Sequence, residues 1–288
     1  MSRNGFVTRF APSPTGRLHP GHAYSALLAY ERACREGGRF LLRIEDIDTT
    51  RARPEWVRGI FEDLSWLGLR WEEPVRHQSA HMDDYASALE RLRAMGVLYP
   101  CFCTRKDIRA AIAASASAPH GPLGMIYPGT CRKLSTGERG QRMAAGEHYA
   151  LRLDAERAAR IAGAGALTWF DERHGPQRVD IRAFGDVVLA RKDIPVSYHL
   201  AVTVDDALQG ITHVIRGEDL LPATAVHRLL QALLDLPVPV YHHHALLVDA
   251  AGRRLAKCDG AETLAEMRAR GLSADDVRAA LKQWAREG

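Results

Sequence analysis

The loop of residues 11–22, with the sequence APSPTGRLHPGH, carries His19 and His22 on either side of a Pro-Gly pair. Pro20 favours the start of a helix at this point. Free N–H groups and the positive end of a helix dipole favour a bound phosphate, and Gly21 leaves room for a nucleotide. Both histidines could donate hydrogen bonds to phosphate oxygens as charge moves onto a leaving pyrophosphate. The alternative is a plain turn with two surface histidines, the commoner outcome for an isolated His-x-x-His.

Three of the five cysteines, Cys101, Cys103 and Cys131, crowd into one stretch of the chain. An odd number of cysteines clustered in this way is more typical of a metal site than of a disulfide framework. With Tyr127 the stretch offers three thiolates and a phenol, and Zn²⁺ favours three or four soft ligands in a tetrahedral array. Buried free thiols are the alternative interpretation. His120 is a further candidate ligand, because imidazole is a common partner of zinc.

The elements that must position these residues alternate between strand and helix along the first third of the chain. Apolar strands are expected at residues 7–11 and 39–44, with helices opened by Pro20 and Pro54. This alternation predicts a parallel sheet. The pattern breaks near residue 100 and resumes after about residue 190. We therefore expect an α/β fold: a Rossmann-like, nucleotide-binding parallel sheet with residues 100–190 inserted as a zinc-bearing subdomain, and a short helical C-terminal segment.

The bulk composition is that of an ordinary globular protein. Of the 288 residues, 46% are hydrophobic and 26% are charged, which argues against a disordered or fibrous chain. No apolar run approaches the ~20 residues that span a bilayer, and the N-terminus lacks the apolar core of a signal peptide. We therefore expect a cytoplasmic protein without membrane partners. The net charge of +4 is compatible with a polyanionic partner, although many equally basic proteins never bind nucleic acid.

The sequence FAPSPTG of residues 10–16, followed by HPGH, resembles the signature of the glutamyl and glutaminyl members of the class I aminoacyl-tRNA synthetases. The resemblance implies that ATP, as its Mg²⁺ complex, binds at His19, Gly21 and His22. It also implies the reaction, in which a carboxylate attacks the α-phosphate to give an aminoacyl adenylate. His19 and His22 are accordingly expected to be catalytic.

A second signature of that family carries a lysine and lies late in the chain, where residues 253–259 read RRLAKCD. By resemblance, Lys257 is catalytic and binds ATP, since a mobile ammonium can neutralise charge on the β- and γ-phosphates. The family pattern has a lysine at Arg254 and a serine at Ala256. We expect these departures to slow the reaction without abolishing it.

The family pattern also supplies a glutamate pocket, formed by Arg9, Phe10, Ala11, Pro12, Ser13, Glu45, Tyr198 and Arg216. Arginine can hold a carboxylate through two parallel hydrogen bonds. The resemblance implies that Arg9 and Arg216 contact the amino acid and that Glu45 pairs with its ammonium. Glu45 and Arg216 both follow strand-like runs, at the ends where open α/β sheets bind ligands. Taken singly, each of these residues could instead form a surface ion pair.

The whole chain resembles the stand-alone paralogues of glutamyl-tRNA synthetase. The resemblance implies zinc held by Cys101, Cys103, Tyr127 and Cys131. It also implies that glutamate is activated without tRNA and transferred to queuosine in the anticodon loop of tRNA(Asp). Two rivals remain: a truncated conventional synthetase that charges a tRNA 3′ end, and a non-catalytic RNA-binding relic.

The expected domains follow from this resemblance. Residues 1–99 and 191–250 form a split catalytic domain, and residues 100–190 form the inserted subdomain with the zinc site. Residues 251–288 hold the lysine loop and C-terminal helices. The 31 residues after Lys257 are too few for an anticodon-binding domain, which needs about 50 residues or more. We expect a monomer.

Overall fold

The computed structural model describes residues 5–113, 120–121, 124–191, 194–247 and 262–287, and the expected lysine loop around Lys257 lies outside these ranges. The helices are α1 Pro20–Arg35, α2 Pro54–Trp66, α3 Met82–Ala94, α4 Arg105–Ala113, α5 Thr136–Ala144, α6 Ala155–Ala162, α7 Tyr198–Leu208, α8 Leu221–Leu233, α9 Leu264–Ala269 and α10 Ala274–Glu287. The strands are β1 Val7–Phe10, β2 Arg39–Ile44, β3 Glu72–His77, β4 Leu98–Cys101, β5 His120–Gly121, β6 Gly124–Met125, β7 Ala150–Leu153, β8 Thr168–Asp171, β9 Gly175–Arg178, β10 Val188–Arg191, β11 His213–Gly217 and β12 Val240–His244.

Local signals in the sequence set the ends of the first helices. Both α1 and α2 begin at a proline, which has no N–H to leave unpaired in the first turn, so the expected starts at Pro20 and Pro54 are confirmed. Helix α1 ends just before Gly37, whose φ of 59° is left-handed and reverses the chain into β2. The expected strand at residues 39–44 is β2, with the same bounds.

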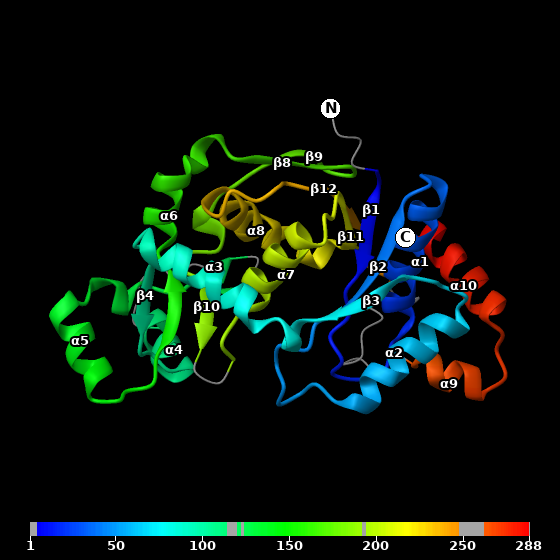
Figure 1. The fold of residues 1–288 in the computed structure, drawn as a ribbon, viewed down its shortest axis with the longest axis horizontal. Coiled ribbons are helices and arrows are strands. Elements are labelled where there is room, and N and C mark those ends of the chain that lie inside the picture. Colours follow the sequence, from blue (N-terminus) through cyan, green and yellow to red (C-terminus); the bar gives the residue numbers. More distant parts are fainter. Residues whose placement is uncertain (1–4, 114–119, 122–123, 192–193, 248–261, 288) are drawn as a thin grey trace.

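A parallel sheet forms the centre of the molecule, as the alternating pattern predicted (Figure 1). Strands β1, β2 and β3 pair in parallel, and β11 pairs in parallel with β12. The two groups of strands adjoin where the backbone N–H of Thr212 donates to the carbonyl of Val7 over 2.9 Å. The carboxyl ends of β1, β2 and β11 therefore come together at one edge of the sheet, where α/β folds bind their ligands.

The stretch expected as an inserted subdomain contributes to this sheet. Strand β8 pairs in parallel with β12 at Asp171 and Tyr241, and β9 pairs antiparallel with β8. The hairpin of β8 and β9 thus extends the sheet that holds β11 and β12. Residues 168–178 consequently stand next to the strands that carry the candidate site.

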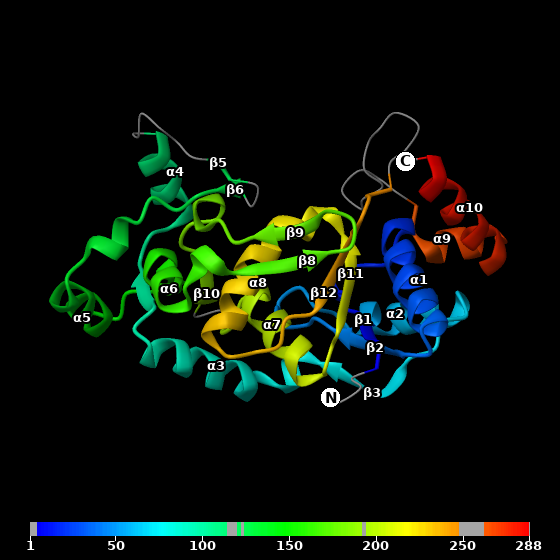
Figure 2. The same cartoon turned by 90° about the horizontal axis from the view of Figure 1, so that it is seen from above.

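The rest of that stretch forms a second lobe at the opposite end of the molecule from α1 and α10 (Figure 2). Its antiparallel sheet has the order β10-β7-β4. Helices α4, α5 and α6 lie in the same lobe in both views. At the other end, α10 lies beside α1, and its buried Val277 and Leu281 belong to the apolar cluster that α1 and α2 also build.

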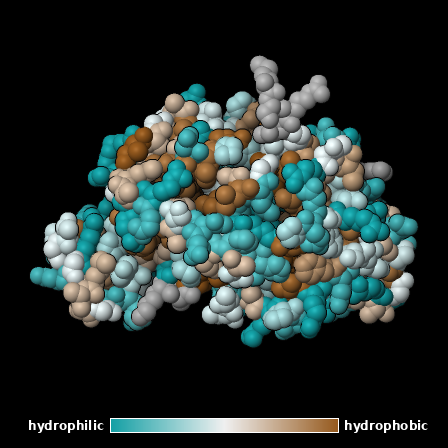
Figure 3. All heavy atoms as spheres, in the orientation of Figure 1, coloured by the Kyte–Doolittle hydropathy of each residue, from teal (hydrophilic) through white to brown (hydrophobic). Residues whose placement is uncertain are grey.

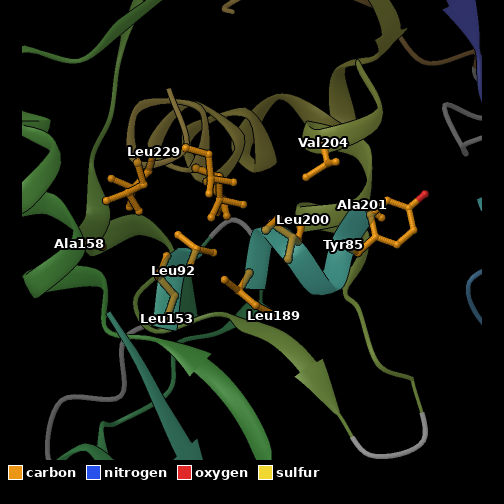
Figure 4. Close-up of a cluster of buried hydrophobic side chains, with 14 of the residues drawn as sticks. Tyr85, Leu92, Leu153, Ala158, Leu189, Leu200, Ala201, Val204 and Leu229 are labelled. Carbon is orange, nitrogen blue, oxygen red and sulfur yellow. The ribbon is translucent and has the colours of Figure 1, made fainter. Parts of the chain in front are cut away.

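The larger apolar core joins the two lobes (Figure 4). Leu92 of α3, Leu153 of β7, Leu189 of β10 and Leu229 of α8 are all fully buried within it. Outside, hydrophilic residues cover most of the face seen in Figure 3, and hydrophobic residues gather near its middle. Within the described residues, no helix combines the length and apolar character that crossing a membrane requires.

Candidate active site

A cavity of about 440 Å³ opens at the carboxyl edge of the sheet, next to the start of α1. Most of the predicted site residues line it together: Arg9, Phe10, Ala11, Pro12, Ser13, His19, Gly21, His22, Glu45, Tyr198 and Arg216. They come from β1 and the loop after it, from the start of α1, from the residue after β2, from the start of α7 and from the end of β11. Lys257 lies outside the described residues, so its place relative to the cavity stays a prediction.

Arg9 and Glu45 are held by a buried network of charges. Arg9 donates from Nε and Nη2 to the two carboxylate oxygens of Asp206, over 2.9 and 3.3 Å. Arg43 donates from Nη1 to Asp206 over 2.8 Å and from Nη2 to Glu45 over 3.2 Å. Its side chain has no exposed surface. Among the described residues, no hydrogen bond occupies Nη1 of Arg9, which leaves that atom for a ligand.

The charges of this network balance each other in a dry environment. Burial alone would lower the pKa of Arg43, but the carboxylates of Asp206, Glu45 and Asp205 raise it above its ordinary value. Burial raises the pKa of Glu45, although Arg43 and Arg9 counter part of that effect. Burial would also raise the pKa of Asp206, but Arg9 and Arg43 dominate and hold that pKa below its usual range. Of these two carboxylates, Glu45 is the one with a raised pKa, so a further cation would stabilise its charged form.

Arg216 reaches the cavity from the end of β11. Its Nη1 atom donates to the phenol oxygen of Tyr198 over 3.3 Å. Its Nε atom donates to Nε2 of His243 over 3.0 Å, and Nη2 donates to Thr224 Oγ1 over 2.7 Å. Only 6% of Arg216 is exposed. The guanidinium therefore sits in a fixed orientation, and Nη1 is the end that it shares with Tyr198 at the cavity.

The two histidines of the loop form a reciprocal cap on α1. His19 is the N-cap, and its Nδ1 accepts from the N–H of Gly21 over 3.1 Å. In return, Nδ1 of His22 accepts from the N–H of His19 over 3.3 Å. Because both Nδ1 atoms accept, each neutral ring carries its proton on Nε2. The cap thus selects the tautomer that makes both rings donors, as a phosphate requires.

A second cavity of about 640 Å³ lies between the lobes. It shares Ser13, Thr15, Glu45 and Tyr198 with the first cavity, so the two meet at the predicted ammonium-binding carboxylate. Its other walls include four arginines and one of the clustered cysteines: Arg51, Arg105, Arg152, Arg191 and Cys103. A basic cavity that opens onto a reaction centre can bind an anionic co-substrate.

The predicted metal ligands also come together. The sulfur of Cys103 lies 3.5 Å from that of Cys131 and 3.4 Å from the phenol oxygen of Tyr127. The three cysteine sulfurs, including that of Cys101, all lie within 4.8 Å of one another. Zinc at about 2.3 Å from each sulfur would separate them by about 3.8 Å, so this donor set fits the ion. His120 lies on β5, but its side chain is outside the described part, so it stays untested.

Sequence reasoning missed the residues that support the site from behind. Arg43 was placed on an apolar strand without a role of its own, and Asp206 was not singled out. Arg43 and Asp206 are 163 residues apart in the sequence, so no local sequence pattern indicates that they pair. A signal did exist for the cap on α1, because polar acceptors at the N-cap and three residues later are typical of a capping box.

The cavity, the strand ends and the capped helix start are those of a class I synthetase catalytic domain. Residues 6–286 match the family described as tRNA synthetases class I (E and Q), catalytic domain. The Glutamyl-Q tRNA(Asp) synthetase of Rhodobacter capsulatus is 51% identical, over 94% of this chain and 98% of its own length. That of Nocardia farcinica is 47% identical, over 96% and 84%. The chain belongs to this class I family, alongside its glutamyl-Q tRNA(Asp) synthetases.

A solved structure agrees with this placement. The crystal structure of a glutamate tRNA ligase from Elizabethkingia meningosepticum, in complex with its amino acid, is 31% identical and superposes with a TM-score of 0.74. The match covers 89% of this chain and 53% of that one. This chain therefore spans about half the length of that ligase.

Proposed function

We propose that this protein activates L-glutamate with ATP, without tRNA, and transfers it to queuosine in the anticodon loop of tRNA(Asp). One observation carries the proposal: a single cavity brings together cations for carboxylates, an anion for an ammonium and a helix start for phosphates. The curated relatives named Glutamyl-Q tRNA(Asp) synthetase, which match nearly the whole chain, support the choice of acceptor.

In the activation step, a carboxylate oxygen of glutamate attacks the α-phosphorus of ATP, and pyrophosphate leaves. Arg9 and Arg216 hold the amino acid's carboxylates while Glu45 pairs with its ammonium. The phosphates bind at the start of α1, where Gly21 permits close approach and the Nε2–H groups of His19 and His22 donate to them. Lys257 neutralises the leaving pyrophosphate.

In the transfer step, a hydroxyl of the modified base attacks the adenylate carbonyl. An ester forms, AMP leaves, and the hydroxyl proton passes to solvent. The second cavity suits the acceptor, because it meets the first at Glu45 and Tyr198 and its arginines can bind backbone phosphates. Unstacked bases of a single-stranded loop can enter such a cavity, whereas a duplex cannot.

Zinc belongs to the same proposal. Cys101, Cys103, Tyr127 and Cys131 would hold the ion, and their bonds to it would link the end of β4 to the short turn Thr130–Lys133. Cys103 also lines the second cavity, so a bound ion would stabilise one wall of the acceptor site. With four protein ligands the ion would have a structural role.

Exchange of radiolabelled pyrophosphate into ATP tests the activation step. We expect exchange that depends on glutamate and proceeds without RNA. Lys257→Ala should slow it ~100-fold or more, as loss of one preorganised charge contact does. Lys282→Ala, at an exposed lysine of α10, is the matched control and should leave the rate unchanged. An absence of exchange with wild-type protein would support the non-catalytic relic instead.

A further inference from the structure

Asp171 of β8 and His243 of β12 lie near Arg216 of β11 in the sheet. Strands β8, β12 and β11 are neighbours in Figures 1 and 2. In the register of the sheet, His243 of β12 stands opposite Arg216 of β11. Asp171 of β8 pairs with Tyr241, two residues before His243. The side chains of Asp171 and His243 have no exposed surface. They are therefore shielded from water, and neither residue lines the cavity that Arg216 lines.

The carboxylate of Asp171 is fully engaged in hydrogen bonds. Its Oδ2 atom accepts from Nδ1 of His243 over 2.6 Å. Its Oδ1 atom accepts from Nδ1 of His174 over 2.8 Å and from the backbone N–H groups of Arg173 and His174, both over 3.0 Å. Burial alone would raise the pKa of Asp171, but these hydrogen bonds lower it to about 2. Asp171 is thus charged across the physiological range.

The charge on Asp171 fixes the tautomer of His243. An ionised carboxylate can only accept, so Nδ1 of His243 must carry a proton. Burial and the nearby charge of Arg216 lower the pKa of His243 to about 3, so the ring is neutral. Its Nε2 atom therefore presents a lone pair, which accepts the Nε–H of Arg216 over 3.0 Å.

The other donors of Arg216 show which end is left for a ligand. Nη2 donates to Thr224 Oγ1 over 2.7 Å and to the carbonyl of Leu220 over 3.3 Å. Nη1 donates one hydrogen to Tyr198. Its second hydrogen has no partner among the described residues. The guanidinium is thus held along its Nε and Nη2 sides, and Nη1 faces the cavity.

We propose that Asp171 and His243 are positioning residues that fix the guanidinium of Arg216, so that it contacts a carboxylate of the amino acid end-on through Nη1. This rests on the proposed function of the cavity. The contact differs from the side-on grip with two parallel hydrogen bonds that arginine often makes, because Nε and Nη2 are occupied. Tyr198, whose oxygen accepts from Nη1, can donate its own proton to the same carboxylate.

The tautomer gives the sharpest test. Asp171→Asn keeps the size of the side chain but places an amide that can donate toward Nδ1 of His243. The ring then moves its proton to Nε2, and two donors face each other between His243 and Arg216. We expect the KM for glutamate in pyrophosphate exchange to rise about 10-fold or more, as when a group that orients a ligand is lost. The KM for ATP should stay within about twofold, since the phosphates bind elsewhere.

Two further variants separate positioning from folding. His243→Asn retains a donor for Asp171 but withdraws the acceptor from Arg216, and should raise the KM for glutamate in the same way. His174→Ala removes a different hydrogen bond to Asp171 on a partly exposed side chain and should leave that KM unchanged. An unchanged KM for glutamate in folded Asp171→Asn would overturn the proposal, as would an equal rise in the KM for ATP.

Nitrogen NMR of histidine-labelled wild-type protein tests the same arrangement without catalysis. We expect His243, assigned from the His243→Asn spectrum, to be neutral with its proton on Nδ1 between pH 6 and 8. A proton on Nε2, or a charged ring, would overturn the proposal even if exchange is normal. If the tautomer is as expected but no glutamate-dependent exchange occurs, the proposed function fails while the hydrogen-bonded chain from Asp171 to Arg216 stands.

Discussion

Arg43, whose side chain has no exposed surface, donates a 2.8 Å hydrogen bond to Asp206. The same Asp206 oxygen accepts from Nε of Arg9 over 2.9 Å, and Arg43 also contacts Glu45. Two residues that the site needs for a ligand, Arg9 and Glu45, are thus bound to each other through two residues that never reach the cavity. The orientation of Arg9 and Glu45 therefore depends on the hydrogen bonds that Arg43 and Asp206 make.

Arg43→Met should therefore destabilise the protein strongly. It would leave the carboxylates of Asp206 and Glu45 buried with one cation fewer, a change that costs about 3–5 kcal/mol. The control is Arg39→Gln on the same strand, where an exposed ion pair with Glu72 is worth about 0–1 kcal/mol. Urea denaturation of the three proteins measures both effects. Equal losses in the two variants would mean that the buried network does not hold the site.

His19→Asn separates the structural from the chemical role of the loop histidines. Asparagine is a good N-cap, so the free energy of unfolding should change by less than about 1 kcal/mol. It lacks the Nε2–H donor, and the rate of glutamate-dependent exchange should fall about 100-fold, as for a lost transition-state contact. An exchange rate near that of wild type would make His19 a helix cap alone.

The pH dependence of glutamate binding should reflect Glu45. Its carboxylate must be ionised to pair with an ammonium, and burial raises its pKa above the ordinary value. The KM for glutamate should therefore rise as the pH falls through that raised pKa, earlier than for a solvated glutamate. In Glu45→Gln the KM should be high at every pH, with this dependence gone. The same pH profile in both proteins would assign the titration to another group.

Much of the fold followed from local signals, because prolines open α1 and α2 and glycines end α1. Eleven of the residues that line the first cavity were also named from the sequence, since they belong to short motifs that the family resemblance supplied. Arg43, Asp206, Asp171 and His243 were not, because each acts through partners far along the chain. Strand β8 was assigned to an inserted subdomain for the same reason: its pairing with β12 joins residues 70 positions apart.

The cysteine cluster predicts about one zinc per chain, as expected of a closed structural site. Cys103→Ser should lower the metal content of purified protein, because a hydroxyl is a poorer zinc ligand than a thiolate. Cys34→Ser, at an exposed cysteine of α1, should leave the content unchanged. Elemental analysis of the three proteins is the measurement. Metal-free wild-type protein would mean that the three thiols are merely buried.

The central claim is that queuosine in tRNA(Asp) accepts the glutamate, and charging with radiolabelled glutamate tests it most directly. Three RNAs are compared: tRNA(Asp) carrying queuosine, the same tRNA with unmodified guanosine, and tRNA(Glu). We predict label only on the queuosine-containing tRNA(Asp), as an ester that mild alkali releases. Prior periodate oxidation of the queuosine diol should abolish it. Label on tRNA(Glu), or label that survives periodate oxidation, would contradict the account and favour a conventional synthetase that charges a 3′ end.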